Sequence, residues 1–299
     1  MNTDYLMLKL SIKRDQAELA EAALLDNGAL SCTYQDATDT PIHEPAPGTA
    51  PLWPEVIVTG IFAQGSDSDI VTRLVTDQIR QFSDAQVTAE SVPDTDWERA
   101  WMDEFKPVEI TSALWIVPSF CEPPDSTAVN ISIDPGLAFG SGTHPTTHLC
   151  LQWLAKQDLK NKLVIDYGCG SGILAIAAAR LGAAKVFAFD IEAQALLATE
   201  ENATRNGVAG KITICHSDKD LPQSVDIVVA NILLSPLLEL RSRFTDLLAD
   251  GGKLGVSGVL SEQLPVLAES YATELRHSES EQREQWALYT AVKHGFISP

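Results

Sequence analysis

The chain has 299 residues, 45% of them hydrophobic and 21% charged, which is the composition of a globular protein with room for two domains. Its formal net charge of −20 argues against direct nucleic-acid binding, because that binding needs a cationic surface to replace counterions. The chain contains no apolar run of about 18 residues, so no membrane span is predicted. Its five cysteines are scattered and form no C-x-x-C pair, which predicts free thiols rather than disulfides or a metal site.

The first 93 residues alternate between strand and helix patterns. Apolar and polar side chains alternate over residues 5–12, as they do in a half-buried strand. The order β-α-β-β-α-β predicts a smaller α+β domain of the ferredoxin-like type. A loop with five prolines, over residues 36–54, interrupts this pattern. The expected strands are 5–12, 30–35, 56–62 and 86–92, and the expected helices are 15–25 and 68–81.

The acidic charge is concentrated in this first part of the chain. Residues 1–105 carry 6 Lys+Arg and 19 Asp+Glu, a net charge of −13, whereas residues 106–299 carry a net charge of −7. Such acidity suits a basic protein partner, although a role in solubility explains it equally well. Since no cluster of catalytic type accompanies it, we expect residues 1–93 to form a substrate-recognition domain. The amino terminus lacks the pattern of a secretory signal, which predicts a cytoplasmic protein.

A short helix is expected between the two domains. Residues 94–105, DTDWERAWMDEF, begin with an Asp that can cap a helix, and they place Trp97 and Trp101 on one face. These aromatic side chains suit packing at a domain junction better than a ligand cage. The segment is therefore interpreted as a linker helix, and residues 106–299 as the second domain.

The second domain opens with expected strands at 114–118 and 129–133, followed by the unusual segment DPGLAFGSGTHPTTHLCLQWL. Thr146 or Thr147 can cap the helix that ends this segment, and the first amides of that helix can receive a carboxylate. The competing interpretation is a capped loop in which His144 has no chemical task.

A glycine-lined turn then joins a strand to a helix over residues 163–190. Gly168, Gly170 and Gly172 form the pattern G-x-G-x-G, and Ile173 stands where a dinucleotide-binding motif needs its third glycine. The pattern is typical of S-adenosylmethionine methyltransferases, although a tight turn without a ligand remains the alternative. Asp190 ends the next strand, where an acidic side chain can accept hydrogen bonds from ribose hydroxyls.

The remaining residues continue an alternating α/β pattern. A strand over 225–230 ends directly before Asn231, and Asp250-Gly251-Gly252 predicts a turn before the next strand. The expected helices are 193–206, a segment ending at 248, and 262–269; the expected strands are 212–215, 225–230, 253–257, 274–277 and 286–292.

Three motifs on successive strand ends, DYGCGSG, AFGSGTHPTT and ANILLSPL, together resemble the PrmA family, the bacterial methyltransferases of protein eleven of the large ribosomal subunit. The resemblance covers nearly the whole chain. It implies a class I, Rossmann-like α/β methyltransferase domain behind a ferredoxin-like recognition domain, with an extra antiparallel strand near the carboxyl end. It also implies S-adenosyl-L-methionine as cofactor and that ribosomal protein as substrate, methylated on lysine side chains and on its α-amine.

The resemblance implies cofactor contacts at Thr147, Gly168, Gly170, Asp190 and Asn231. Asn231 is also the expected catalytic residue, because it lies beside the reacting centre, while Asp218 is expected near the adenine amino group. No metal is expected, and the enzyme is expected to act as a monomer.

The expected chemistry requires a neutral acceptor amine, since a free lysine with a pKa near ~10.4 is almost wholly protonated at neutral pH. Positioning should supply most of the catalysis, and His144 is only a candidate base. One alternative is an enzyme for another amine or a glutamine amide, but glutamine and adenine enzymes carry an N-P-P-Y type motif where Ile232 and Leu233 stand here. Another is a domain that binds the cofactor without catalysis.

Overall fold

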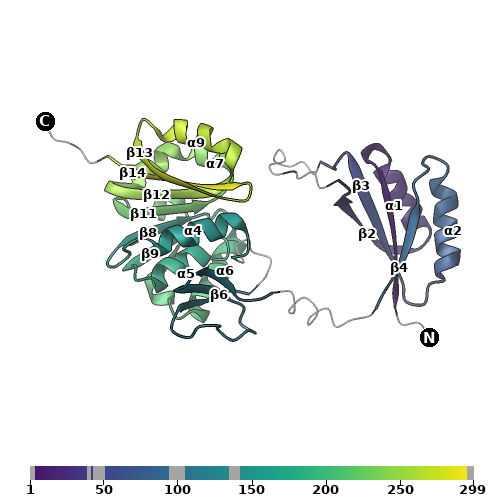
Figure 1. Cartoon of the computed structure of the whole chain (residues 1–299), viewed down its shortest axis with the longest axis horizontal. Coiled ribbons are helices and arrows are strands. Elements are labelled where there is room, and N and C mark those ends of the chain that lie inside the picture. Colours follow the sequence, from purple (N-terminus) through teal and green to yellow (C-terminus); the bar gives the residue numbers. More distant parts are fainter. Residues whose placement is uncertain (1–3, 39–41, 43–50, 94–104, 135–141, 295–299) are drawn as a thin grey trace. The chain divides into compact units, whose positions relative to one another are not determined.

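The computed structural model describes residues 4–38, 42, 51–93, 105–134 and 142–294. The chain divides into two compact units, Met1–Ala100 and Trp101–Pro299 (Figure 1). The helix predicted over residues 94–105 lies outside the described residues, apart from Phe105. No helix among the described residues is long and apolar enough to cross a bilayer.

The first unit is a four-stranded antiparallel sheet with two helices. The strands lie in the order β2-β3-β1-β4, and every neighbouring pair is antiparallel. This order confirms the ferredoxin-like fold. The elements are β1 (Tyr5–Lys13), α1 (Ala17–Asp26), β2 (Ala29–Asp36), β3 (Glu55–Phe62), α2 (Ser68–Ile79) and β4 (Val87–Val92).

Alternation along β1 produces the core of this unit. Its inward side chains, Leu6, Leu8, Leu10 and Ile12, are buried with apolar residues of α1, α2 and β3. Each such side chain contributes about 1.5–3 kcal/mol relative to an exposed one. The unit therefore has a hydrophobic core of its own.

The second unit begins with a small three-stranded sheet in the order β5-β6-β7, made of β5 (Val108–Thr111), β6 (Leu114–Val117) and β7 (Val129–Ser132). The sequence pattern did not predict β5, whose four residues are too few to show alternation. The side-chain amide of Asn206 makes two hydrogen bonds with the backbone of Ser132 in β7. It accepts from Ser132 N at 2.7 Å and donates to Ser132 O at 2.8 Å.

The main sheet of this unit has seven strands in the order β10-β9-β8-β11-β12-β14-β13. The first five are parallel, and β14 runs antiparallel to both of its neighbours. The predicted Rossmann-like sheet and its antiparallel strand are thus confirmed. The strands are β8 (Leu163–Tyr167), β9 (Lys185–Phe189), β10 (Ile212–Cys215), β11 (Val225–Asn231), β12 (Leu248–Leu260), β13 (Leu275–Arg283) and β14 (Trp286–Lys293).

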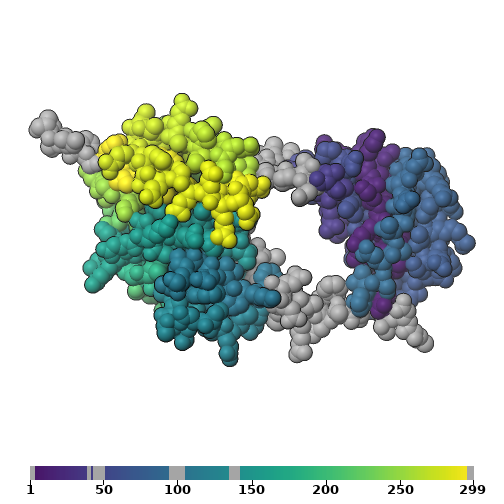
Figure 2. Space-filling view, in the orientation of Figure 1, coloured from purple at the N-terminus to yellow at the C-terminus, as the bar shows by residue number. Residues whose placement is uncertain are grey.

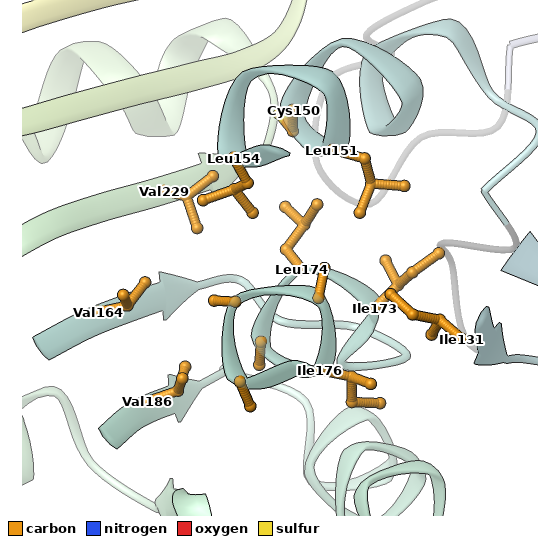
Figure 3. Packing of buried hydrophobic residues seen from close by; sticks show 14 of the residues in the cluster. Ile131, Cys150, Leu151, Leu154, Val164, Ile173, Leu174, Ile176, Val186 and Val229 are labelled. Atoms are coloured by element: carbon orange, nitrogen blue, oxygen red, sulfur yellow. The ribbon is translucent and has the colours of Figure 1, made fainter. Parts of the chain in front are cut away.

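Helices cover both faces of this sheet. Buried side chains of α4, α5 and α6 share one hydrophobic core with the strands, and those of α7, α8 and α9 share the other. Figure 3 shows the first core, where Leu174 of α5 points toward Leu151 and Leu154 of α4. The helices are α4 (Pro145–Ala155), α5 (Ile173–Arg180), α6 (Ala193–Arg205), α7 (Leu234–Glu239), α8 (Arg241–Leu247) and α9 (Leu264–Tyr271).

Further details of this unit differ from the sequence-based expectation, and β13 extends to Arg283 beyond the strand expected over 274–277. The helix predicted to end at residue 248 is two helices that meet at Leu240. The turn predicted at Asp250-Gly251-Gly252 lies inside β12, where Gly251 has a φ of +75°. The edge strand β13 is largely exposed in the surface hairpin with β14, drawn in yellow in Figure 2, and its charged side chains discourage pairing with another sheet.

Candidate active site

The candidate site lies where parallel strands of the main sheet end. From β8 the chain builds β9 and β10 on one side, and it later returns to place β11 on the other side of β8. Ligands of open α/β sheets bind at such a switch point. A cavity of about 380 Å³ is found there, and all five residues predicted to contact a cofactor line it: Thr147, Gly168, Gly170, Asp190 and Asn231.

A second hollow, of about 290 Å³, lies at the opposite end of the strands. It is lined by Lys162 and Asp226, which form an ion pair at 2.8 Å, and by residues 249–253. Both side chains stand at the beginnings of β8 and β11, away from the carboxyl ends. The switch-point cavity is therefore the better candidate.

The glycine turn closes one side of the cavity. Gly168, Gly170 and Gly172 all have positive φ, at +79°, +54° and +79°. A Cβ on Gly168 would lie 2.4 Å from Cγ2 of Ile232, far inside the usual separation of carbon atoms. The absence of side chains thus keeps the turn close to its neighbours and leaves its backbone facing the cavity.

Helix α6 holds the glycine turn from outside. Thr199 Oγ1 donates to the Gly170 carbonyl at 3.1 Å, and Asn202 Nδ2 donates to the Ser171 carbonyl at 2.9 Å. Neither residue was predicted from the sequence. Their spacing of three places them on one helix face, but nothing in the local pattern identifies partners about thirty positions away.

Asp190 lies directly beyond β9 and is bound to the turn. Its Oδ2 accepts from Gly170 N at 2.9 Å, and its Oδ1 accepts from Glu192 N at 3.0 Å. A carboxylate oxygen can accept two hydrogen bonds, so each oxygen retains capacity for a ligand hydroxyl. The backbone fixes the carboxylate in a position suited to a pair of neighbouring hydroxyl groups.

Thr147 and Asn231 meet on the other side of the cavity. Asn231 Nδ2 donates to Thr147 Oγ1 at 3.1 Å, although the two residues are 84 positions apart. This hydrogen bond fixes the amide plane and leaves the Asn231 carbonyl oxygen as an acceptor. The site thus combines a carboxylate at one end with an oriented amide at the other.

The expected cap of α4 was wrong. The N-cap is His144, whose Nδ1 accepts from Thr146 N at 3.3 Å and lies 2.7 Å from Thr146 Oγ1. Thr146 and Thr147 belong to the first turn of the helix. Burial lowers the pKa of His144. Its ring lies edge to face with that of Trp286, with 4.8 Å between the ring centroids. A neutral ring suits the capping role, because an accepting nitrogen carries no proton.

Asp218 has a partner of its own. Arg243 Nε donates to its carboxylate at 3.0 Å, and Arg243 Nη2 donates to its backbone carbonyl at 2.7 Å. Asp218 is not among the described residues that line the cavity, so its expected contact with an adenine amino group stays a prediction.

Asp166, the acid that precedes the glycine turn, is fully buried. Its Oδ2 accepts from Ala175 N at 2.9 Å, while its Oδ1 has no protein partner. Burial raises the pKa of this carboxyl group to about 7. The folded protein therefore binds this proton more tightly than the unfolded chain, in which the pKa is near 3.8.

This raised pKa predicts a pH dependence of stability. Between the two pKa values the folded state holds more protons, so the contribution of Asp166 is largest at low pH and is lost as the pH rises through about 7. We expect Asp166→Asn to reduce the fall in melting temperature between about pH 5 and 7, measured without ligand. Asp226→Asn is the control, because the pKa of Asp226 is lowered and this group stays ionised over that range. An unchanged pH dependence in Asp166→Asn would contradict the assignment.

Comparison with known proteins identifies the family. The sequence model described as "Ribosomal protein L11 methyltransferase (PrmA)" matches residues 4–294. The chain belongs to this family. A ribosomal protein L11 methyltransferase from Legionella pneumophila (strain Corby) is 46% identical over 274 residues, which cover 92% of this chain and 94% of the relative. Another, from Escherichia coli (strain SMS-3-5 / SECEC), is 44% identical over 292 residues, covering 97% and 99%.

A solved structure supports the same conclusion for the larger part of the chain. The crystal structure titled ribosomal protein L11 methylase, from Lactobacillus delbrueckii subsp. bulgaricus, has a TM-score of 0.59 and is 33% identical. It covers 64% of this chain and 100% of that chain. This PrmA family member is thus an S-adenosylmethionine-dependent methyltransferase with a Rossmann-like fold.

The switch-point cavity fits S-adenosylmethionine. Gly168 and Gly170 line the cavity without side chains, so a ligand can lie against the backbone of the turn. Asp190 offers acceptors for the two ribose hydroxyls, and the apolar wall formed by Phe189, Ile191 and Leu240 suits an adenine ring. The residues present are therefore compatible with the cofactor of the family.

Proposed function

We propose that this enzyme transfers methyl groups from S-adenosylmethionine to lysine side chains and to the α-amine of ribosomal protein L11. The observation that carries the proposal is the convergence of Thr147, Gly168, Gly170, Asp190 and Asn231 on one cavity, from four separate segments of the chain. Relatives that align with almost all of this chain are named for that substrate. Transfer of labelled methyl groups to purified L11 tests the proposal, and failure to label it would contradict it.

The residues of the cavity divide into two roles. The glycine turn and Asp190 would bind the cofactor, with Asp190 accepting from the ribose hydroxyls. Thr147 and Asn231 would face the reacting end, where the cofactor supplies an electrophilic methyl group on a sulfonium. Their hydrogen bond at 3.1 Å holds the Asn231 amide in one orientation. This preorganisation avoids reorientation of the amide during the reaction.

The acceptor must arrive at the site as a neutral amine. The apolar lining beside Asn231, which includes Ile232, Leu233 and Pro236, excludes water from the acceptor and lowers the pKa of its ammonium form. The Asn231 carbonyl oxygen would then accept an N–H hydrogen bond and direct the nitrogen lone pair toward the methyl group. As positive charge develops on nitrogen, the same oxygen would stabilise it.

The first unit would recognise the substrate. Residues 1–105, which include this unit, carry a net charge of −13, and this acidity suits a lysine-rich protein. We therefore assign residues 1–93 to recognition, 94–105 to a linker and 106–299 to catalysis. Under this proposal the enzyme acts in the cytoplasm as a monomer, without a nucleic-acid partner.

Asp190→Ala is expected to weaken cofactor binding by about 1.5–3 kcal/mol, because two hydrogen bonds to a charged acceptor are lost. The fold should survive, since the residue is only partly buried at the end of β9. Calorimetric titration with S-adenosylhomocysteine measures the effect. Asp226→Asn is the matched control and should leave the affinity unchanged, because that carboxylate is paired with Lys162 at the opposite end of the strands and does not line the cavity. Wild-type affinity in a folded Asp190→Ala enzyme would remove Asp190 from the ribose role.

A further inference from the structure

Ile232 is in contact with the glycine turn through its side chain. Its Cγ2 lies 2.4 Å from the position that a Cβ on Gly168 would take. Non-bonded carbon atoms normally lie about 3.5–4.0 Å apart, so the Ile232 methyl group occupies the space that a side chain on Gly168 would need. Because isoleucine is β-branched, its χ1 is stiff and the methyl group has little freedom to move away.

The backbone of Ile232 is in contact with a second glycine, from the other side. A Cβ on Gly258 would lie 2.2 Å from the Ile232 carbonyl oxygen and 2.7 Å from its carbonyl carbon. Gly258 has a φ of +90° and lies where the pairing of β12 with β14 shifts register. The Ile232 amide also donates to Ser257 O at 3.2 Å. The bulge in β12 is thus shaped around the residue that follows Asn231.

These contacts place Ile232 between the two halves of the site. On one side is the turn that would hold the methyl donor, and the residue before it is Asn231, which would hold the acceptor. Gly168, Asn231 and Ile232 all line the same cavity. Any displacement of the Ile232 backbone therefore moves Asn231 relative to the glycine turn.

We propose that Ile232 is a positioning residue that sets the separation between methyl donor and acceptor. Its side-chain methyl group packs against Gly168, and its backbone carbonyl packs against Gly258. The proposal rests on the proposed function, since it assumes that Asn231 holds the acceptor. Transfer requires the reacting atoms to be about 3–3.5 Å apart, and a shift of about 1 Å can lower the rate about 10²-fold. The two glycines should then affect different steps, because one contacts the side chain and the other contacts the backbone.

The Gly168 contact is tested by a double-mutant cycle read as affinity for S-adenosylhomocysteine. Gly168→Ala should weaken binding strongly, because the new Cβ meets Cγ2 of Ile232. Ile232→Ala deletes that atom, so the double variant should bind better than Gly168→Ala alone. Gly207→Ala is the control for backbone strain, because Gly207 has a φ of +68° and open space around its Cβ position. If the losses of binding free energy in Gly168→Ala and Ile232→Ala simply add in the double variant, the side-chain contact is not the cause of the loss.

The Gly258 contact is tested by the rate of a single turnover on L11 with saturating cofactor. Gly258→Ala must displace the Ile232 carbonyl by about 1 Å to reach a normal C···O separation of about 3.3 Å. The rate should fall about 10²-fold while the affinity for S-adenosylhomocysteine changes little. Gly251→Ala, in the same strand at a φ of +75° with open space, should keep the wild-type rate.

Ile232→Val is a second measure that does not depend on the glycine variants remaining folded. Valine keeps the β-branched methyl groups and should retain most of the single-turnover rate, whereas Ile232→Ala should lose it. Equal rates for the two variants, or an equal loss in Gly258→Ala and Gly251→Ala, would overturn the positioning role. A wild-type enzyme that leaves L11 unmodified would instead refute the proposed function, and the affinity cycle would still report on the Gly168 contact.

Discussion

Asn231→Ala should lower the rate of methyl transfer about 10²–10³-fold while changing cofactor affinity far less. The reason is that the proposed hydrogen bond from the acceptor strengthens only as charge develops on its nitrogen, so its loss affects the transition state more than the ground state. Asn231 lies at the end of β11 and is only partly buried, so the substitution leaves the core intact. Single-turnover transfer to L11 and calorimetric titration of S-adenosylhomocysteine measure the two effects separately.

Thr147→Val is the matched control for Asn231. It removes the hydroxyl group that accepts from Asn231 Nδ2 at 3.1 Å but keeps the side chain's shape, so it should cause a smaller loss of rate than Asn231→Ala. A folded Asn231→Ala enzyme with the wild-type single-turnover rate would show that Asn231 does not hold the acceptor.

Removal of residues 1–105 is the second change with a large expected effect. The shortened chain should fold and bind cofactor, because both hydrophobic cores of the second unit consist of residues from Val108 onward. Its kcat/KM on L11 should fall by about 10²-fold or more, because the acceptor amine is no longer presented at the cavity. Titration with S-adenosylhomocysteine and a transfer assay on intact L11 give both quantities.

The electrostatic part of recognition has its own test. Association of the full-length enzyme with L11 should slow as salt rises, since exposed charges are screened over about 8 Å at physiological ionic strength. Glu18→Lys with Asp69→Lys, on the first unit, should slow association more than Glu200→Lys with Glu201→Lys, on α6 of the second unit; all four side chains are exposed. A shortened enzyme that methylates L11 at the full-length rate would remove the recognition role, whereas salt-independent association would remove only the charge contribution.

The sequence predicted those features of the fold that depend on local pattern. Alternation along β1 and the short apolar strands before Asp190 and Asn231 fix which residues are buried, and the ends of parallel strands meet at one edge of a sheet. Positive φ at Gly168 also follows from a turn between strand and helix. Sequence pattern together with family resemblance therefore suffices to place the five candidate residues in one site.

Contacts between distant segments could not be predicted in this way. The hydrogen bonds from Thr199 and Asn202 to the glycine turn, and the pairing of Asp218 with Arg243, depend on how helices pack across the sheet. The cap of α4 was also misjudged, since His144 takes the role that threonine fills more often. Ile232 had no local signal at all, because Gly168 and Gly258 lie 64 and 26 positions from it.

Mass spectrometry of L11 after incubation with the enzyme and S-adenosylmethionine tests the central claim most directly. We predict methyl groups on lysine side chains and on the α-amine, located by fragmentation, with far fewer added by Asn231→Ala under the same conditions. L11 that stays unmodified, although the same enzyme preparation binds S-adenosylhomocysteine, would contradict the proposed function.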